Sequence, residues 1–129
     1  MRFFGDDLEP DELTQLLNCQ PTEAYKKGHI VTTTVRPRTV KTGMWFLTVE
    51  KNSNQTLEEQ IFELLEKLPK DLKIWEELSK RFESSVYCGA WLKNWNRDVW
   101  FSSDLFRQLA DRHLSIGLAI YCDCEEDEE

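Results

Sequence analysis

Apolar and polar positions along the chain predict short strands and helices that begin within the first few residues. Phe3 and Phe4 form a strand that ends at Gly5. A helix follows from Pro10, because proline fits the first helical position, where an N–H group would have no partner. Leucines at helical spacing give this helix one apolar face: Leu13, Leu16 and Leu17.

The middle of the chain predicts a central strand and two consecutive helices. Residues 44–50 carry apolar side chains on both faces of the expected strand, which is typical of a central position in a sheet. Thr56 and Glu59 have the spacing of a capping box at the start of a helix. Pro69 ends that helix, and a second one begins near Asp71. The two helices form an αα-hairpin that covers one face of the sheet.

The last third of the chain predicts a hairpin, a helix and a final strand. Residues 86–95 alternate as a long strand, and after a turn residues 99–101 return beside it. A helix capped by serine covers 102–112. The final strand covers 115–122, where glycine and alanine leave one face thin enough for close contact with a helix or an aromatic ring.

Three tryptophans gather around this expected hairpin: Trp91, Trp95 and Trp100. They have two interpretations. Aromatic side chains on neighbouring strands can stack and form a small additional core. Alternatively, they form an exposed aromatic platform for a partner, since tryptophan is enriched among the residues that dominate binding energy at protein interfaces.

Together these elements predict an α+β fold with two layers, a mostly antiparallel sheet and helices on one face. Both ends of the chain read as strand, helix and strand, which favours a ferredoxin-like plait with the αα-hairpin inserted between its halves. Residues 1–122 form a single domain in this interpretation. Residues 123–129 hold six of the 24 acidic residues and form an acidic, disordered tail.

Five carboxylates crowd the turn between the first strand and the first helix: Asp6, Asp7, Glu9, Asp11 and Glu12. One interpretation is structural, because negative charge in the first turn of a helix opposes the helix dipole. The other is a negative patch for a basic partner. A calcium loop would need a longer series of oxygen ligands closed by a bidentate acid, and the turn contains no such series.

Residues 22–42 form a basic connection that also has two interpretations. It contains a β-branched run at 30–35, which indicates a ragged hairpin or an edge strand. Its bases can face the acidic turn of the same chain. Alternatively, Lys27, Arg36 and Arg38 form an anion site in which the two arginines supply forked donors. No glycine-rich phosphate loop accompanies them.

The chain contains several short patterns in a fixed order: F-x-G-D-D-L-x-P-D-E-L-T-x-L-L at 3–17, P-T at 21–22, K-G at 27–28, T-G-x-W at 42–45 and F-S-x-D-L-x-x-x-L-A at 101–110. Together they resemble a small bacterial family catalogued as domain of unknown function 4279 (DUF4279). The resemblance spans nearly the whole chain and implies a small mixed α/β domain with no assigned catalytic residues. This chain departs from the pattern in beginning almost directly on its first strand.

Net charge is −8, but its distribution changes what it implies. Without 123–129, 18 acidic residues face 16 basic ones, so the body is nearly neutral and has no long basic face for phosphates. We therefore expect no nucleic-acid ligand. No apolar run reaches the length of a membrane span and no signal peptide precedes the first strand, which predicts a cytoplasmic protein with no membrane partner.

The sequence predicts no catalytic residue, no metal site and no cofactor. It lacks the serine elbow, the zinc-protease helix motif and the phosphate-binding loop. Cys122 and Cys124 are two zinc ligands at most, without a second close pair. The acids around them raise the pKa of a thiol and so oppose a nucleophilic role.

These observations favour a non-enzymatic protein-binding domain. The concrete hypothesis is an immunity-like or antitoxin-like protein that neutralises a basic toxin such as a nuclease. In this hypothesis the acidic turn and the acidic tail accelerate encounter, and the tryptophans supply buried contact area. The alternative is a small-ligand regulatory module that binds an anion with residues 22–42.

Overall fold

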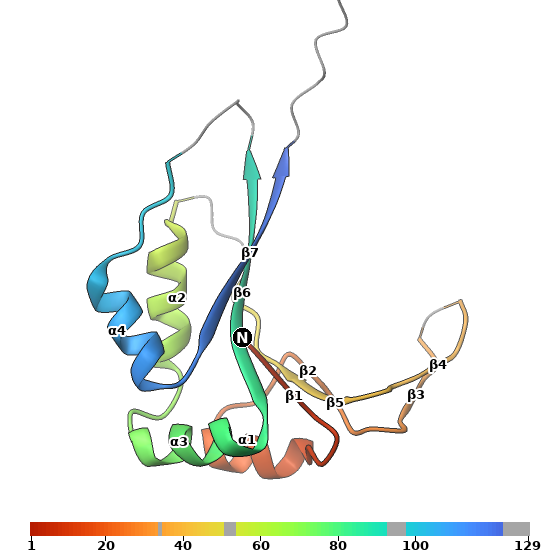
Figure 1. The fold of residues 1–129 in the computed structure, drawn as a ribbon. Helices are drawn as coiled ribbons and strands as arrows, with labels where there is room; N and C mark the ends of the chain where they lie inside the picture. The colour runs from red at the N-terminus through yellow and green to blue at the C-terminus, as the bar shows by residue number, and fades with distance from the viewer. Residues whose placement is uncertain (34, 51–53, 93–97, 123–129) are drawn as a thin grey trace, which may run out of the picture.

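The computed structural model describes residues 1–33, 35–50, 54–92 and 98–122. Its elements alternate between strands and helices, with two helices in succession at the centre of the chain (Figure 1). In order they are β1 (Arg2–Gly5), α1 (Pro10–Leu17), β2 (Glu23–Tyr25), β3 (Ile30–Val31), β4 (Arg38–Thr39), β5 (Gly43–Phe46), α2 (Leu57–Glu66), α3 (Leu72–Arg81), β6 (Glu83–Leu92), α4 (Ser103–Asp111) and β7 (Ser115–Cys122).

The described residues form one five-stranded mixed sheet in the order β2-β5-β1-β6-β7 and a separate ribbon of β3 and β4. The first three strand pairs are antiparallel, and β6 and β7 are parallel. The fold is therefore α+β with a mostly antiparallel sheet, as predicted. The prediction that residues 44–50 form a central strand is confirmed in position, since β5 lies between β2 and β1, although β5 ends at Phe46.

The ferredoxin-like plait is not confirmed. In that plait each βαβ unit is split, so that another strand lies between its two parallel strands. Here α4 connects β6 to β7, and these two strands are direct neighbours. An unsplit βαβ unit therefore forms the end of this sheet, where the predicted topology placed a hairpin.

The predicted hairpin of 86–95 with 99–101 is wrong. Residues 98–101 form no strand, and the neighbour of β6 is β7, which pairs with it from Ser85 to Leu92. The physical reason is length: β7 offers eight residues for pairing, whereas the chain at 99–101 must turn into α4. Trp91 and Trp100 consequently do not share a hairpin. Trp95 and residues 123–129 lie outside the described residues.

A single apolar core fills the space between the sheet and the helices. Phe3 lies at its centre, with its ring 5.9 Å from that of Trp45 and 6.2 Å from that of Trp75. The indole N–H of Trp45 donates to Thr14 Oγ1 of α1 over 3.2 Å, and that of Trp75 donates to the Pro69 carbonyl over 2.8 Å. All four helices contribute leucine or isoleucine side chains to this core, so they cover one face of the sheet.

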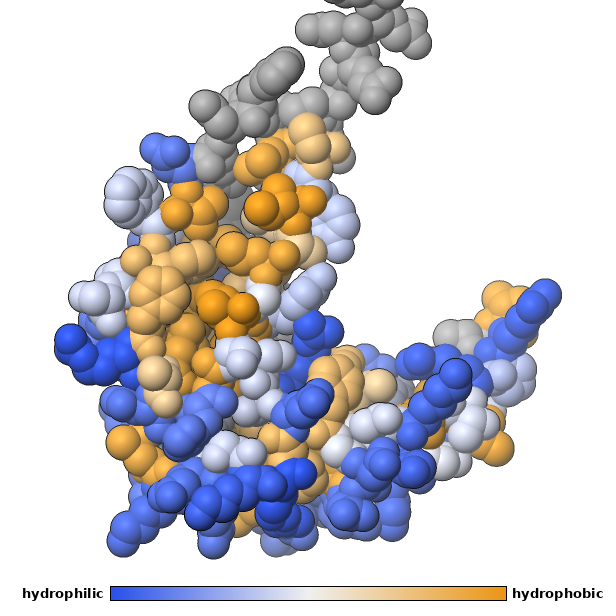
Figure 2. Space-filling model, viewed as in Figure 1, coloured by the Kyte–Doolittle hydropathy of each residue, from blue (hydrophilic) through white to orange (hydrophobic). Residues whose placement is uncertain are grey.

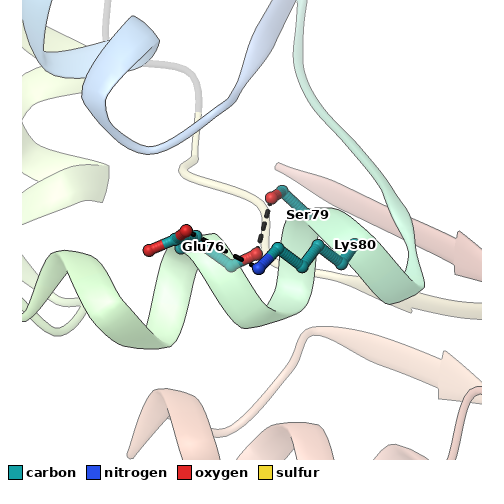
Figure 3. A network of polar contacts seen from close by, with 3 residues as sticks. All are labelled: Glu76, Ser79 and Lys80. Carbon is teal, nitrogen blue, oxygen red and sulfur yellow. Dashed lines mark hydrogen bonds and ion pairs between the residues drawn. The ribbon is translucent and has the colours of Figure 1, made fainter.

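Local chemistry explains where the helices begin and how they face solvent. Thr56 accepts a hydrogen bond from the Glu59 N–H, and Ser102 accepts one from the Leu105 N–H, as the capping patterns predict. On the exposed side of α3, Ser79 Oγ donates to the Glu76 carbonyl and Lys80 Nζ lies 3.6 Å from the Glu76 carboxylate (Figure 3). The polar side of α3 therefore faces solvent, and Trp75 on its apolar side is buried.

Candidate functional site

Among the described residues no helix covers the second face of the sheet, and this face is rich in aromatic side chains. We call this surface the aromatic face, made of Phe4, Phe46, Tyr87, Trp91 and Tyr121. The Trp91 and Tyr121 rings stack with centroids 5.2 Å apart, and the Phe4 and Phe46 rings meet edge to face at 5.5 Å. About half of each side chain at Tyr87, Trp91 and Tyr121 is exposed. The face is therefore a preformed aromatic surface.

Two glycines set the height of these rings above the sheet. A Cβ atom at Gly117 would lie 3.3 Å from the Tyr87 ring, and one at Gly89 would lie 2.9 Å from the Trp91 ring. The rings therefore lie flat on the backbone of β6 and β7, which confirms the expectation that the thin face of the last strand suits an aromatic ring. Aromatic rings held in this way lose little freedom when a partner covers them.

Beside β6 the surface opens into a cleft of about 1210 Å³, which we call the β6 cleft. One wall is residues 46–50, which continue β5, and the other is residues 86–91 of β6. Residues 55–61 at the start of α2 form the floor, and Met1 closes one end. Residues 98–100 complete the rim. β1 pairs with Glu83, Ser84 and Ser85 of β6, and the cleft lies beside the part of β6 that follows this pairing and continues to Leu92.

The lining of the β6 cleft is apolar in the interior and acidic at the rim. Glu50, Glu59 and Asp98 are exposed, and no ion pair joins them to a basic side chain within the described residues. Hydrogen bonds from Ser102, through its side chain and through its backbone N–H, lower the pKa of Glu58. The guanidinium of Arg2 lies 3.9 Å from the centre of the Tyr87 ring, a cation–π contact.

The α-amino group of Met1 donates a hydrogen bond to the Leu47 carbonyl over 2.7 Å at the closed end of the cleft. Burial disfavours its charged form and lowers its pKa from 8.0 to about 6, and the positive charge of Arg2 adds to this effect. The thiol of Cys88 lies close enough to oppose that shift, but its own pKa is raised by burial. A neutral amine and a neutral thiol therefore face this end of the cleft near pH 7.

The chemistry of the cleft suits recognition of a partner. The described residues that line it include no histidine and no lysine. The Cys88 thiol is protonated near neutral pH because burial raises its pKa, so it is a poor nucleophile. What the lining offers is apolar area, exposed carboxylates and the backbone of β6. These are the features of a surface that binds a chain or a side chain.

Exposed apolar side chains extend the cleft toward the ends of β6 and β7. Figure 2 shows apolar atoms that run over the upper part of the molecule, whereas the surface at α1 and α3 is mainly hydrophilic. Trp100 is 80% exposed at the rim, and Trp91 is 45% exposed beside it. Leu118 and Ile120 of β7 are also exposed on the side of the strand that carries the core lower down. Trp100 is exposed, whereas Trp91 is about half exposed and stacks on Tyr121 of the neighbouring strand, so Trp91 has features of both interpretations. Their role as a platform for a partner stays a prediction.

The acidic turn is engaged by bases of its own chain. Lys26 Nζ lies 2.8 Å from Glu9, Lys27 Nζ lies 3.5 Å from Asp6, and Arg81 donates to Glu12. Hydrogen bonds to these carboxylates raise the pKa of both Lys26 and Arg81. Within the described residues, no ion pair involves the remaining two carboxylates of the turn, Asp7 and Asp11.

The residues predicted to bind an anion lie on or beside the β3–β4 ribbon, which extends away from the helices (Figure 1). Lys27 precedes the ribbon and contacts Asp6, as the structural interpretation of this segment predicts. Arg38 lies on β4, and Arg36 lies in the turn between the two strands. The anion site stays a prediction, and the carboxylate of Asp6 competes with an anion for Lys27.

Sequence reasoning named Trp91 and Trp100 but missed the cleft beside them. It also missed Tyr87, Tyr121 and Arg2. The alternation of Tyr87 and Trp91 along one strand, opposite Gly117 and Ala119 on another, is the sequence signal that relates to the aromatic face. No local signal marks the cleft, because the cleft depends on where one strand ends beside another.

These features define the class of protein. It is an α+β domain with a mixed sheet, an aromatic face and a cleft at a strand edge. The chain belongs to the family described as domain of unknown function (DUF4279), whose model matches residues 1–123. Comparisons with curated proteins and with solved structures found no match.

Two further searches covered the described residues alone. None of their helices is long and apolar enough to cross a membrane. No group of three or more histidine, cysteine, aspartate or glutamate side chains among them is arranged to hold a metal ion.

Proposed function

We propose that this protein is a non-enzymatic binding domain that sequesters a basic protein partner. The most concrete form of the proposal is an immunity-like or antitoxin-like protein that neutralises a basic toxin such as a nuclease. The partner docks on the β6 cleft and the adjoining aromatic surface. The observation that supports the proposal is the combination there of exposed tryptophans with exposed carboxylates that form no ion pair within the described residues.

The physical support comes from how interfaces distribute their energy. Large aromatic side chains at the centre of an interface account for much of the affinity, and Trp91 and Trp100 lie together on the cleft lining. Charges at the rim act mainly on the rate of encounter and on the choice of partner. The excess of acid at this rim and the net charge of −8 both favour a basic partner.

The test is binding and protection by the wild-type protein and two single variants. The candidate partners are basic toxins encoded next to this protein, produced as isolated toxin domains. We expect Trp91→Ala and Trp100→Ala each to raise Kd by about tenfold or more, with a matching loss of protection against toxicity. The matched controls are Ile30→Ala and Leu72→Ala, which remove exposed apolar side chains far from the cleft.

Two results would overturn the proposal. One is that no basic protein encoded beside this one binds it. The other is that the control variants weaken binding as much as the tryptophan variants do. Thermal unfolding of each variant shows whether a loss of binding reflects a loss of folding, which matters most at Trp91 because its ring stacks on Tyr121.

A further inference from the structure

The two outer strands of the five-stranded sheet differ in length and in charge. β2, at one edge, has three residues and begins with the charged Glu23. β7, at the other edge, has eight residues, and none of them is charged or is proline. Proteins usually protect a sheet edge with a short strand, a charged side chain or proline, because an unprotected edge pairs with other strands. By this criterion β2 is protected and β7 is not.

The outer edge of β7 has no neighbouring strand within the described part of the chain. β6 pairs with β7 along its inner edge, and the order of strands in the sheet ends at β7. The end of β7 extends beyond α4 (Figure 1). Ile116 packs against the core, whereas Leu118, Ile120 and Tyr121 are exposed. The edge therefore offers unpaired main-chain groups together with exposed apolar side chains.

The composition of β7 favours an uncharged strand as its occupant. The protein carries a net charge of −8, yet the strand Ser115–Cys122 contains no charged residue. A basic segment finds no carboxylate on this strand, so charge does not attract it here. A second copy of β7 brings no charge into the contact and meets no like charge directly opposite, which is the arrangement that destabilises paired strands.

The side chains of β7 also match those of a second, antiparallel β7 related by a two-fold axis at Ala119. Residues directly opposite in an antiparallel pair lie on the same face. In this register Leu118 of each copy lies opposite Ile120 of the other, so these exposed side chains cover each other. On the other face, Tyr121 lies opposite Gly117, whose missing side chain leaves room beside the Tyr87 ring. The strand is therefore complementary to itself.

We propose that two copies of this protein associate through the outer edges of β7 in antiparallel orientation and so join their two sheets into one. The contact is isologous, since each copy contributes the same strand. The opposite edge of each sheet is the protected strand β2, so association ends at two copies. The β6 cleft lies beside the other edge of β6, and the dimer leaves it open. The inference therefore goes beyond the proposed function and does not depend on it.

The first test measures the oligomeric state of the whole protein. A single strand pair buries less area than a standard interface, so sedimentation equilibrium over about 1–200 µM should show monomer and dimer in exchange. Ile120→Lys introduces a charge into the contact and is expected to raise the dissociation constant of the dimer by about tenfold or more.

The matched control is Ile30→Lys, which makes the same change at an isoleucine of β3. The exposed fraction is 57% at Ile30 and 65% at Ile120, so neither substitution removes a core side chain. The control is expected to leave the dissociation constant unchanged. A protein that is monomeric at every concentration, or equal losses in the two variants, would overturn the inference.

The second test locates the two-fold axis with cysteine. In Ala119→Cys the two new residues lie directly opposite, with Cβ atoms about 4.5–5.5 Å apart, and mild oxidation should give a covalent dimer. In the control, Ser115→Cys, the two new residues are offset by eight positions, or about 26 Å, and should not cross-link. Both proteins also carry Cys122→Ser and Cys124→Ser. A covalent dimer from the control, or none from Ala119→Cys, would overturn the inference.

Salt distinguishes this inference from the proposed function. Two copies that each carry a net charge of −8 repel each other, so the dimer should become tighter as salt rises. Binding of a basic partner should become weaker. A dimer that weakens with salt would contradict a contact through an uncharged strand. If the protein binds a basic toxin as a monomer, the inference is wrong and the proposed function stands. If the β7 dimer forms and no basic protein binds, the reverse holds.

Discussion

The two ends of this molecule treat their charged and apolar groups in opposite ways. At the end formed by α1 and α3, carboxylates of the acidic turn contact Lys26, Lys27 and Arg81 of the same chain, and the apolar side chains lie inside. At the end formed by β6, β7 and the start of α2, no ion pair within the described residues engages the carboxylates of the cleft, and Trp91 and Trp100 are exposed. Apolar surface gathers at this end (Figure 2). This difference is the reason for proposing that a partner docks at the end formed by β6, β7 and the start of α2.

The largest expected difference between the two ends is in the cost of removing a tryptophan. Trp45→Ala deletes a fully buried side chain and its hydrogen bond to Thr14, and we expect it to lower the free energy of unfolding by about 3–5 kcal/mol. Trp91→Ala removes a ring that is 45% exposed and should cost about 1 kcal/mol or less. Denaturant unfolding measures both. Similar costs for the two would mean that Trp91 belongs to the core.

A second expected effect concerns the boundary between the ends, where the Met1 amine is buried. Its pKa is 8.0 when exposed and about 6 in the fold, so the folded state disfavours the proton. The contribution of the neutral amine to the free energy of unfolding is therefore complete above pH 8. It decreases as pH falls from 8 to 6, because the unfolded chain binds the proton at a higher pH than the folded chain does. The loss amounts to about 3 kcal/mol. Unfolding of the protein with a free and with an acetylated amine should differ in this window, and parallel pH profiles would contradict the burial of the amine.

A smaller effect is expected at the closed end, where Glu12 and Arg81 form an ion pair in which each side chain is nearly half exposed. Exposed pairs contribute little, so a double-mutant cycle of Glu12→Gln and Arg81→Met should give a coupling energy of about 1 kcal/mol or less. The coupling should decrease further in high salt. A coupling several times larger would show that the acidic turn holds α1 to α3 and would change its role from charge balance to structure.

The smallest expected effect is that of inorganic phosphate on the basic residues 22–42. Because Asp6 already contacts Lys27, we expect millimolar phosphate to change the melting temperature by less than about 1 °C. Lys27→Ala serves as the control and should behave identically. A saturable rise in melting temperature that disappears in Lys27→Ala would favour the alternative function, an anion-binding module built on Lys27, Arg36 and Arg38.

How much of this the sequence predicted depends on the distance along the chain over which each interaction acts. Helix starts at Thr56 and Ser102 follow from side chains that bond to the backbone within a few residues, so local patterns suffice. The contacts of Lys26 and Lys27 with the acidic turn were predicted from opposite charges on adjacent segments. The contact of Arg81 with Glu12 was not, because the two residues are 69 positions apart.

Strand pairing was the point at which prediction failed. The alternation in β6 fits an antiparallel neighbour at 99–101 as well as it fits the parallel neighbour β7, and only the completed βαβ unit distinguishes them. The β6 cleft was beyond prediction for a related reason. It lies beside the part of β6 that follows the pairing with β1, and that pairing is a property of register between distant segments.

The most direct measurement compares charge reversal at the two ends of the molecule against one basic partner. Glu50→Lys with Asp98→Lys alters the rim of the β6 cleft, and Asp7→Lys with Asp11→Lys alters the acidic turn by the same net charge. Equilibrium titration should give a rise in Kd of about tenfold or more for the first variant and of less than about threefold for the second. A larger loss for the acidic-turn variant would contradict the account and would place the partner on α1.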